Sequence, residues 1–403
     1  MVGRSDQVEA LTPRSVISRT ADRMLHRTAL AGPQPVSAEA AALHASVPVV
    51  DLLLGSAIMR PRFLGRRRRG HADLPRLREG GVDLVGLSIA TRHPDLRGTS
   101  STPFFWSQGL PRSVLGSDMA IAQALVDRIE GWARGSGEAL RIVRGREDLD
   151  LVGPASGWLG AFLGVQGGHV LEGDVSNLER LHERGVRMLA LAHVMDNALV
   201  GSNTGAERGG LKGLGREVIA ECERLGILVD LAHMSNAGIR EALPLLTRPF
   251  VLSHTGFTQL AGGGNRRRRY SPGTRNLPSD EARLVAEAGG VIGVTLSTWL
   301  LGGDDLGAVG RAFDLALEIA GPTQVAIGSD MDGGLRMVVD AAGMPALTDE
   351  LLRRGHDTHT VEAVMGGNAL RVLRAAYTDP RATAAATGSH TSTGVALSKA
   401  GQP

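Results

Sequence analysis

Residues 224–256, RLGILVDLAHMSNAGIREALPLLTRPFVLSHTG, decide the fold of this chain. Two apolar runs in this stretch, at residues 227–231 and 249–252, are too short for typical helices and predict buried strands. Residues 236–246, between these runs, carry apolar side chains at roughly helical spacing. The stretch therefore predicts a strand, a helix and a second strand, and a right-handed crossover makes the two strands parallel neighbours.

A histidine follows each predicted strand, at His233 and His254. The carboxyl ends of parallel strands meet at one edge of a sheet, where barrels and open α/β sheets place their ligand chemistry. Two imidazoles at such an edge can bind a metal ion, because histidine is a common zinc ligand. The alternative is a pair of hydrogen-bonded structural histidines, and the matched strand ends favour the metal site.

The composition restricts the classes of partner. The chain has 403 residues, is 42% hydrophobic, and has 44 Lys and Arg against 42 Asp and Glu, so we expect no nucleic-acid partner. Cys222 is the only cysteine, which excludes a disulfide framework. The first residues lack the apolar core of a signal peptide, and no apolar run is long enough to span a membrane. We therefore expect a cytoplasmic protein.

Predicted strands alternate with helices along most of the chain, which favours a (β/α)8 TIM-type barrel over a doubly wound sheet. No glycine-rich dinucleotide or P-loop motif is present. We expect a helical extension at residues 1–46, the barrel at 47–378 and a disordered tail at 379–403. The predicted strands lie at residues 47–54, 82–90, 140–143, 158–165, 188–193, 227–231, 249–252, 291–296 and 324–327.

Polar side chains gather at the ends of these strands. A carboxylate at Asp330 can bind a metal ion or accept a proton from a metal-bound water, although it can also cap a loop together with Asp332. We favour the functional interpretation because Asp330 is predicted at the same edge as the histidines. The complete set is Asp51, Gln166, His193, His233, His254 and Asp330.

Ordered motifs from about residue 47 to 373 resemble the membrane (renal) dipeptidase family, peptidase family M19, of the amidohydrolase superfamily. The resemblance implies a barrel and zinc-dependent hydrolysis of dipeptides. The motifs are HADLPRLREGG (71–81), GVQGGH (164–169), LAH (191–193) followed by DN (196–197), DLAHMS (230–235), SHT (253–255), RNL (275–277), GSDMDG (328–333) and GNALRV (367–372).

The resemblance also implies roles for individual residues. His233 and His254 match ligands of one metal of the family's pair. His193 matches a substrate-contacting histidine near the developing oxyanion, and Asp330 matches the catalytic aspartate. Arg275 matches the arginine that binds the substrate carboxylate, which a guanidinium fork suits geometrically.

Several family positions are altered in this chain. The first strand of the family ends in a His-x-Asp pair that binds the other metal, and the corresponding residues here are Leu53 and Gly55. Gln166 replaces the glutamate that bridges the metals, so it is at best a weak neutral ligand. The family's strand-end tyrosine is replaced near Ser297. We therefore expect at most one zinc ion per chain.

The nearby His71 and Asp73 do not restore the missing pair, because they belong to a separate family motif downstream of it. If the scaffold is otherwise intact, the replacements Leu53→His, Gly55→Asp and Gln166→Glu are expected to recreate the family's ligand set.

Three hypotheses for function follow from these positions. The first is a hydrolase of a dipeptide-like or related amide, with one metal on His233, His254 and either Gln166 or Asp330. The second is an inactive, dipeptidase-like pseudoenzyme that binds ligands. The third is a metal-independent enzyme of a specialised pathway that uses Asp330 and His193 as acid and base. In each case the partner is a small molecule that is dipeptide-like or otherwise bears a carboxylate, and a homodimer is one expected assembly.

Two arginine runs, at residues 66–69 and 266–269, are most simply solvated loops. If both lie over the barrel mouth, they attract an anionic ligand. Nucleic acid is the weaker alternative because the runs have little aromatic interleaving beyond Tyr270.

Overall fold

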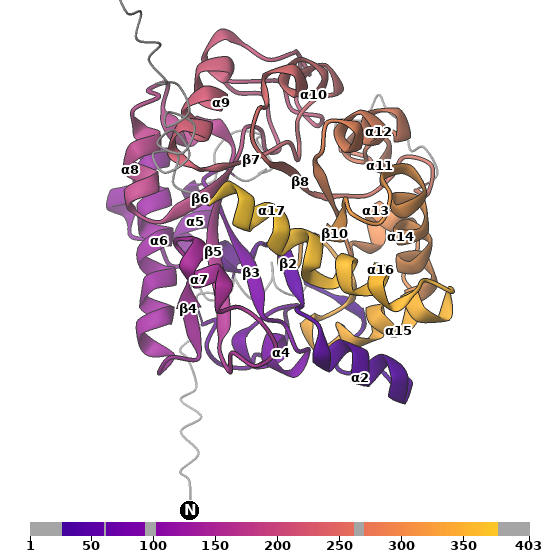
Figure 1. Ribbon diagram of the computed structural model, residues 1–403. Helices are drawn as coiled ribbons and strands as arrows, with labels where there is room; N and C mark the ends of the chain where they lie inside the picture. The colour runs from indigo at the N-terminus through magenta and orange to yellow at the C-terminus, as the bar shows by residue number, and fades with distance from the viewer. Residues whose placement is uncertain (1–25, 60–61, 93–101, 262–269, 378–403) are drawn as a thin grey trace, which may run out of the picture.

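The computed structural model describes residues 26–59, 62–92, 102–261 and 270–377 (Figure 1). The predicted tail at 379–403 and the second arginine run at 266–269 lie outside these ranges. The part of the predicted N-terminal extension that is described contains strand β1 (Thr28–Leu30) and helix α2 (Ala38–Ser46).

Parallel strands close into an eight-stranded barrel, which confirms the predicted fold class. The closing pair is β3 with β5, in continuous register from Leu84 opposite Gly160 to Ala90 opposite Gln166. The short strand β4 (Leu140–Ile142) adds to the start of β5 and lies outside the barrel. The barrel strands are β2 (Val50–Leu54), β3 (Leu84–Ala90), β5 (Leu159–Gln166), β6 (Val186–Ala190), β7 (Leu228–Asp230), β8 (Phe250–Thr255), β9 (Val291–Val294) and β10 (Val325–Ile327).

Helices surround the barrel, and one helix covers its end (Figure 1). Leu370 and Leu373 of α17 pack with residues at the starts of the strands, such as Leu84 and Val291, in one buried cluster. The amino ends of the strands are therefore sealed, which leaves the carboxyl ends for ligand binding. The main helices are α4 (Leu74–Glu79), α6 (Asp118–Gly135), α8 (Asn177–Glu183), α9 (Gly213–Leu225), α10 (Asn236–Ala242), α12 (Ser279–Glu287), α14 (Leu306–Ala320), α15 (Pro345–Arg353), α16 (Thr358–Glu362) and α17 (Asn368–Ala376).

Local details differ from the sequence prediction. The helix predicted at 236–246 ends as α10 at Ala242 and continues as a 3-10 turn at Leu243–Leu245, because Pro244 lacks the N–H that a longer helix needs. The pairing of β1 with β11 (Met337–Val339) was not predicted. Among the described helices, none has the length and apolar character that crossing a lipid bilayer requires.

Candidate active site

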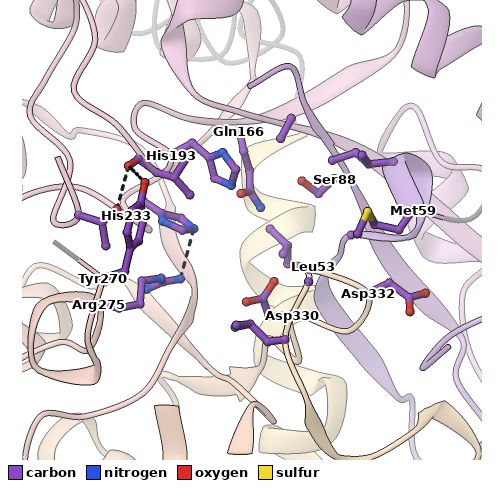
Figure 2. Close-up of a pocket in the computed structure, with 18 of the residues that line it drawn as sticks. Leu53, Met59, Ser88, Gln166, His193, His233, Tyr270, Arg275, Asp330 and Asp332 are labelled. Carbon is purple, nitrogen blue, oxygen red and sulfur yellow. Dashed lines mark hydrogen bonds between the residues drawn. The ribbon is translucent and has the colours of Figure 1, made fainter. Parts of the chain in front are cut away.

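A cavity of about 190 Å³ opens at the carboxyl ends of the barrel strands. It is small compared with the roughly 300–1,000 Å³ of pockets for drug-sized ligands, so it suits a small metabolite. Figure 2 shows its side chains converging on one space. They are Leu53, Gly55, Ile58, Met59, Ser88, Ala90, Gln166, His193, Val194, Thr204, His233, Tyr270, Arg275, Trp299, Asp330, Asp332, Gly333, Gly334 and Leu335.

Two buried aspartates fix the strand ends that carry this site. Asp230 accepts hydrogen bonds from the backbone N–H groups of Ala232 and Ser253, and so joins the end of β7 to β8. Asp51 accepts from the N–H groups of Leu53 and Ser329 in the same way, and so joins β2 to the segment after β10. These contacts satisfy backbone groups that lose their ladder partners where the strands end.

Strained backbone conformations occur at the same strand ends. His233, Asp330 and Asp332 have φ angles of 65°, 60° and 59°, in the left-handed region that non-glycine residues seldom adopt. Each such residue costs on the order of 1–3 kcal/mol, and strain of this kind is concentrated at functional sites. The surrounding hydrogen bonds therefore hold His233 and Asp330 in defined positions.

The two predicted histidines lie together. Their Nε2 atoms are 3.0 Å apart. His254 Nδ1 is 2.8 Å from Ser253 Oγ, which donates to Asp230 Oδ2 at 2.5 Å. Since the serine proton is given to Asp230, His254 donates from Nδ1 and presents the lone pair of Nε2. Burial, followed by the charge of Arg275, holds the pKa of both histidines well below the usual range, so both are neutral at pH 7.

Arg275 contacts the same histidines. Its Nη2 donates to the carbonyl of His254 at 3.2 Å and lies 3.3 Å from His233 Nε2. The residue is only 5% exposed, and within the described ranges its Nε and Nη1 have no protein acceptor. The Nε and Nη1 donors are therefore left for a ligand, and either can donate a charge-assisted hydrogen bond to a carboxylate.

The described residues do not fit the metal centre of the family. They contain no group of three His, Cys, Asp or Glu side chains placed to hold a metal ion. His233 and His254 offer two nitrogens, but Arg275 lies beside one of them. Like charges about 4 Å apart repel by about 4 kcal/mol per pair of unit charges at an effective dielectric constant of 20, which disfavours a divalent cation here.

Asp330 presents an unpaired carboxylate to the cavity. Its side chain has no hydrogen-bond partner in the described part of the chain. Burial raises its pKa to about 6, while Arg275 lowers it and the neighbouring Asp51 raises it. A carboxyl that titrates near neutral pH suits a general acid or base.

Replacing Asp330 with asparagine is expected to stabilise the protein at pH 7.5. The folded protein binds this proton more tightly than the unfolded chain, so stability falls as pH rises from about 4 to about 6 and stays lower above that range. The variant should gain up to about 3 kcal/mol of unfolding free energy at pH 7.5 and little at pH 4.5. Urea unfolding at both pH values measures this, with the exposed Glu318→Gln as control; an equal effect at both pH values would contradict it.

Three polar side chains lie between Arg275 and the opposite wall. His193 Nδ1 is 3.3 Å from the carbonyl of Arg92, and its ring packs edge-on against His233, with centroids 4.7 Å apart. Gln166 and Ser88, at the ends of β5 and β3, have no hydrogen-bond partner within the described ranges. Their amide and hydroxyl groups are available to a ligand.

The opposite wall is apolar and is formed by Leu53, Ile58, Met59 and Ala90. Gly55 lies beside it, and its N–H donates to the carbonyl of Met331 at 2.7 Å. A Cβ atom at Gly55 would lie 2.5 Å from the backbone oxygen of Asp332. The backbone after β10 therefore fills the space into which a side chain at position 55 would project.

Other residues singled out from the sequence lie outside the cavity lining. His254 is buried in contact with His233. Ser297 is fully buried, and its hydroxyl has no hydrogen-bond partner among the described residues. His71 Nδ1 accepts from the backbone N–H of Asp332 at 3.1 Å. Asp73 caps helix α4 by accepting from the N–H of Arg76. His71 and Asp73 thus have structural contacts.

Several residues of the lining were not predicted from the sequence. They are Ser88, Tyr270, Trp299, Met59 and Asp332, the last of which was expected only as a loop cap. Ser88 had a readable signal, because it is a polar residue near the end of an apolar strand. Met59 and Trp299 had none, since each lies in a short helix after a strand and its direction depends on the turn that precedes it.

A comparison with models of protein families shows to which family the chain belongs. The model of the membrane dipeptidase family, peptidase family M19, matches residues 37–386. The chain belongs to this family. Mouse Dipeptidase 3 is 29% identical over 324 residues, which cover 76% of this chain and 58% of the mouse protein. Dipeptidase tcpJ of Claviceps purpurea (strain 20.1) is 28% identical over 327 residues, covering 76% of this chain and 69% of the fungal protein. The match thus spans less than two thirds of the mouse relative.

Solved structures share the fold of this dipeptidase-family chain. An amidohydrolase from Pseudomonas aeruginosa has a TM-score of 0.64 at 24% identity, covering 84% of this chain and 99% of that one. A metallo peptidase from Rhodobacter sphaeroides, liganded with a phosphinate mimic of the dipeptide L-Ala-D-Ala, has a TM-score of 0.68 at 22% identity, covering 82% of this chain and 100% of that one. At these identities the similarity shows the fold alone.

Proposed function

We propose that this dipeptidase-family chain is a small-molecule hydrolase that acts on a dipeptide-like or related amide bearing a carboxylate, with at most one metal ion per chain. One observation carries the proposal: a single cavity gathers guanidinium donors, a carboxylate and an amide that have no partner among the described residues, on Arg275, Asp330 and Gln166. Buried polar groups of this kind are costly unless a ligand pairs them.

Each residue has a defined part in this proposal. Arg275 binds the ligand carboxylate through its Nε and Nη1 donors and so fixes the position of the scissile amide. Asp330, with its pKa near 6, accepts the proton of the attacking water. His193, in the cavity lining, stabilises the developing oxyanion, and Asp330 passes the proton that it took from water to the leaving nitrogen.

A second candidate function, binding without turnover, is favoured by the wall at Leu53 and Gly55. If these positions correspond to the family's His-x-Asp pair, the backbone at Asp332 closes the space for that ligand. The two candidates are distinguished by incubating the protein with a bound amide and measuring product. Release of the free amine supports the hydrolase, whereas binding without product supports the inactive protein.

Turnover of ordinary dipeptides is expected to be at least about 100-fold below the roughly 1–1,000 per second of typical enzymes. An incomplete two-metal centre forgoes a Lewis acid that is worth several kcal/mol, and each 1.36 kcal/mol is a factor of ten. A dipeptide library assayed by amine release, with and without added zinc, measures this. Turnover within the typical range would contradict the proposal.

The homodimer and the cytoplasmic location also stay predictions. Sedimentation of the purified protein tests the first, and fractionation of producing cells tests the second.

A further inference from the structure

His193, His233 and Arg275 lie on one side of the cavity and come from three different segments of the chain (Figure 2). His193 follows β6, His233 follows β7, and Arg275 ends the short helix α11 (Pro272–Arg275). The backbone carbonyl of each of these residues accepts a hydrogen bond from one dipeptide, Ser202–Asn203. This dipeptide therefore ties together the three segments that carry this side of the site.

Asn203 makes two of the three hydrogen bonds, one from its backbone and one from its side chain. Its N–H donates to the carbonyl of His233 at 2.8 Å, and its Nδ2 donates to the carbonyl of Arg275 at 3.1 Å. Its Oδ1 is buried and has no hydrogen-bond partner within the described ranges. Removing the side chain therefore breaks the contact with Arg275 and leaves the backbone contact with His233 in place.

Both acceptors lie at points of the backbone that need an outside partner. Arg275 is the last residue of α11, and the carbonyls of a final helical turn have no partner within their helix. His233 has a φ angle of 65°, and a strained conformation of this kind persists only where neighbouring contacts hold it. Asn203 thus supplies a partner to one helix end and a restraint to one strained residue.

The loop that carries Asn203 is braced from within. The carboxylate of Asp196 accepts hydrogen bonds from backbone N–H groups of the loop at 2.8, 2.8 and 3.2 Å. Thr204 Oγ1 donates to the carbonyl of Val194 at 3.0 Å. Because these contacts fix the loop independently of Arg275, Asn203 can hold Arg275 in place rather than move with it.

We propose that Asn203 is a positioning residue, which holds Arg275 where its guanidinium binds the ligand carboxylate. Asn203 does not line the described cavity, so it acts through Arg275 rather than by touching the ligand. A shift of the Arg275 main chain moves Nε and Nη1, the donors that are left for the ligand. This inference rests on the proposed carboxylate site and adds the residue that sets its geometry.

The test is a double-mutant cycle in the full-length protein, with Asn203→Ala, Arg275→Met and both together. Affinity is measured by calorimetric titration with N-hexanoylglycine and with leucylglycine, two amides that bear a carboxylate. Asn203→Ala is expected to weaken binding about tenfold when Arg275 is present, since a misplacement of about 1 Å can cost about 100-fold. In the Arg275→Met background it should change affinity by less than about twofold, because no guanidinium remains to be positioned.

Asn177→Ala is the matched control. Asn177 Nδ2 donates to the carbonyl of Leu171 at 3.0 Å, so this variant loses a hydrogen bond of the same kind away from the cavity lining. It should lower the urea midpoint of unfolding, as Asn203→Ala does, but leave ligand affinity unchanged. Asn203→Asp is a second variant of Asn203, which keeps the size of the side chain but has an acceptor in place of the NH2 donor. It should weaken binding at least as much as Asn203→Ala.

The outcomes separate this inference from the proposed function. If the Asn203 variants bind as tightly as the unmodified protein, or lose the same factor with and without Arg275, the inference is overturned and the carboxylate site stands. If both Asn203 variants fail to fold while Asn177→Ala folds, the inference is also overturned, because Asn203 is then needed for the fold itself. If neither ligand binds in an Arg275-dependent manner, the inference and the carboxylate site are both overturned.

Discussion

Replacing Arg275 with methionine is expected to weaken binding of every carboxylate ligand by about 100-fold or more. Removing one partner of a buried, hydrogen-bonded charge pair costs about 2–5 kcal/mol, and each 1.4 kcal/mol is tenfold in affinity. Methionine keeps much of the side-chain volume but has no donor for the ligand or for the carbonyl of His254. Titration of N-hexanoylglycine into the two proteins measures the loss.

Two further variants test whether the loss of affinity is specific to the Arg275 guanidinium. Arg275→Lys keeps the charge but loses the planar fork, so it should bind with intermediate affinity. Arg283→Met, on the exposed side of α12, removes an arginine that does not line the cavity and should change nothing. Equal affinity of Arg275→Met and the unmodified protein would show that the carboxylate binds elsewhere.

Replacing Gly55 with aspartate is expected to destabilise the protein by about 3 kcal/mol or more, which is the upper range for overpacking. The new Cβ atom would lie 2.5 Å from the backbone oxygen and 2.7 Å from the carbonyl carbon of Asp332. The neighbouring backbone is fixed by the hydrogen bond from Gly55 to Met331, so it yields at a cost. Urea unfolding of the purified variant measures the change.

The expected strain at Gly55 also affects the replacements that the sequence suggested for restoring the family's metal ligands. The triple replacement Leu53→His, Gly55→Asp and Gln166→Glu should be less stable than the double replacement that leaves Gly55 unchanged. Gly55→Ala isolates the contribution of the Cβ atom. A stable triple variant that gains a second zinc ion would show that the backbone at Asp332 moves aside easily, and it would contradict the closed wall.

The fold could be predicted from the sequence because the patterns that specify its strands and helices are local. The apolar runs that became β2, β3 and β5 are bounded by polar or glycine residues, and their alternation with helices is typical of a barrel. The exact ends of the strands were harder to predict. The strand predicted to reach His193 ends at Ala190, because a strand ends where pairing with its neighbour stops. The pairing of β1 with β11 joins segments about 300 residues apart, which no local pattern encodes.

The site was only partly readable from the sequence. The positions of His193, His233 and Asp330 at strand ends predicted that they share one cavity, and the structure places all three in its lining. The contact of Arg275 with His233 was not predictable, since it depends on the path of a loop and on a side-chain rotamer. The closed space at Gly55 likewise depends on the backbone after β10, which comes much later in the sequence.

We propose that this dipeptidase-family chain works without a two-metal centre. The most direct test is the zinc content of the purified protein after incubation with excess zinc and desalting, measured by mass spectrometry of the metal. We predict at most one zinc ion per chain, and that any zinc retained is lost when His233 and His254 are both replaced with alanine. Two tightly held zinc ions per chain would contradict the claim.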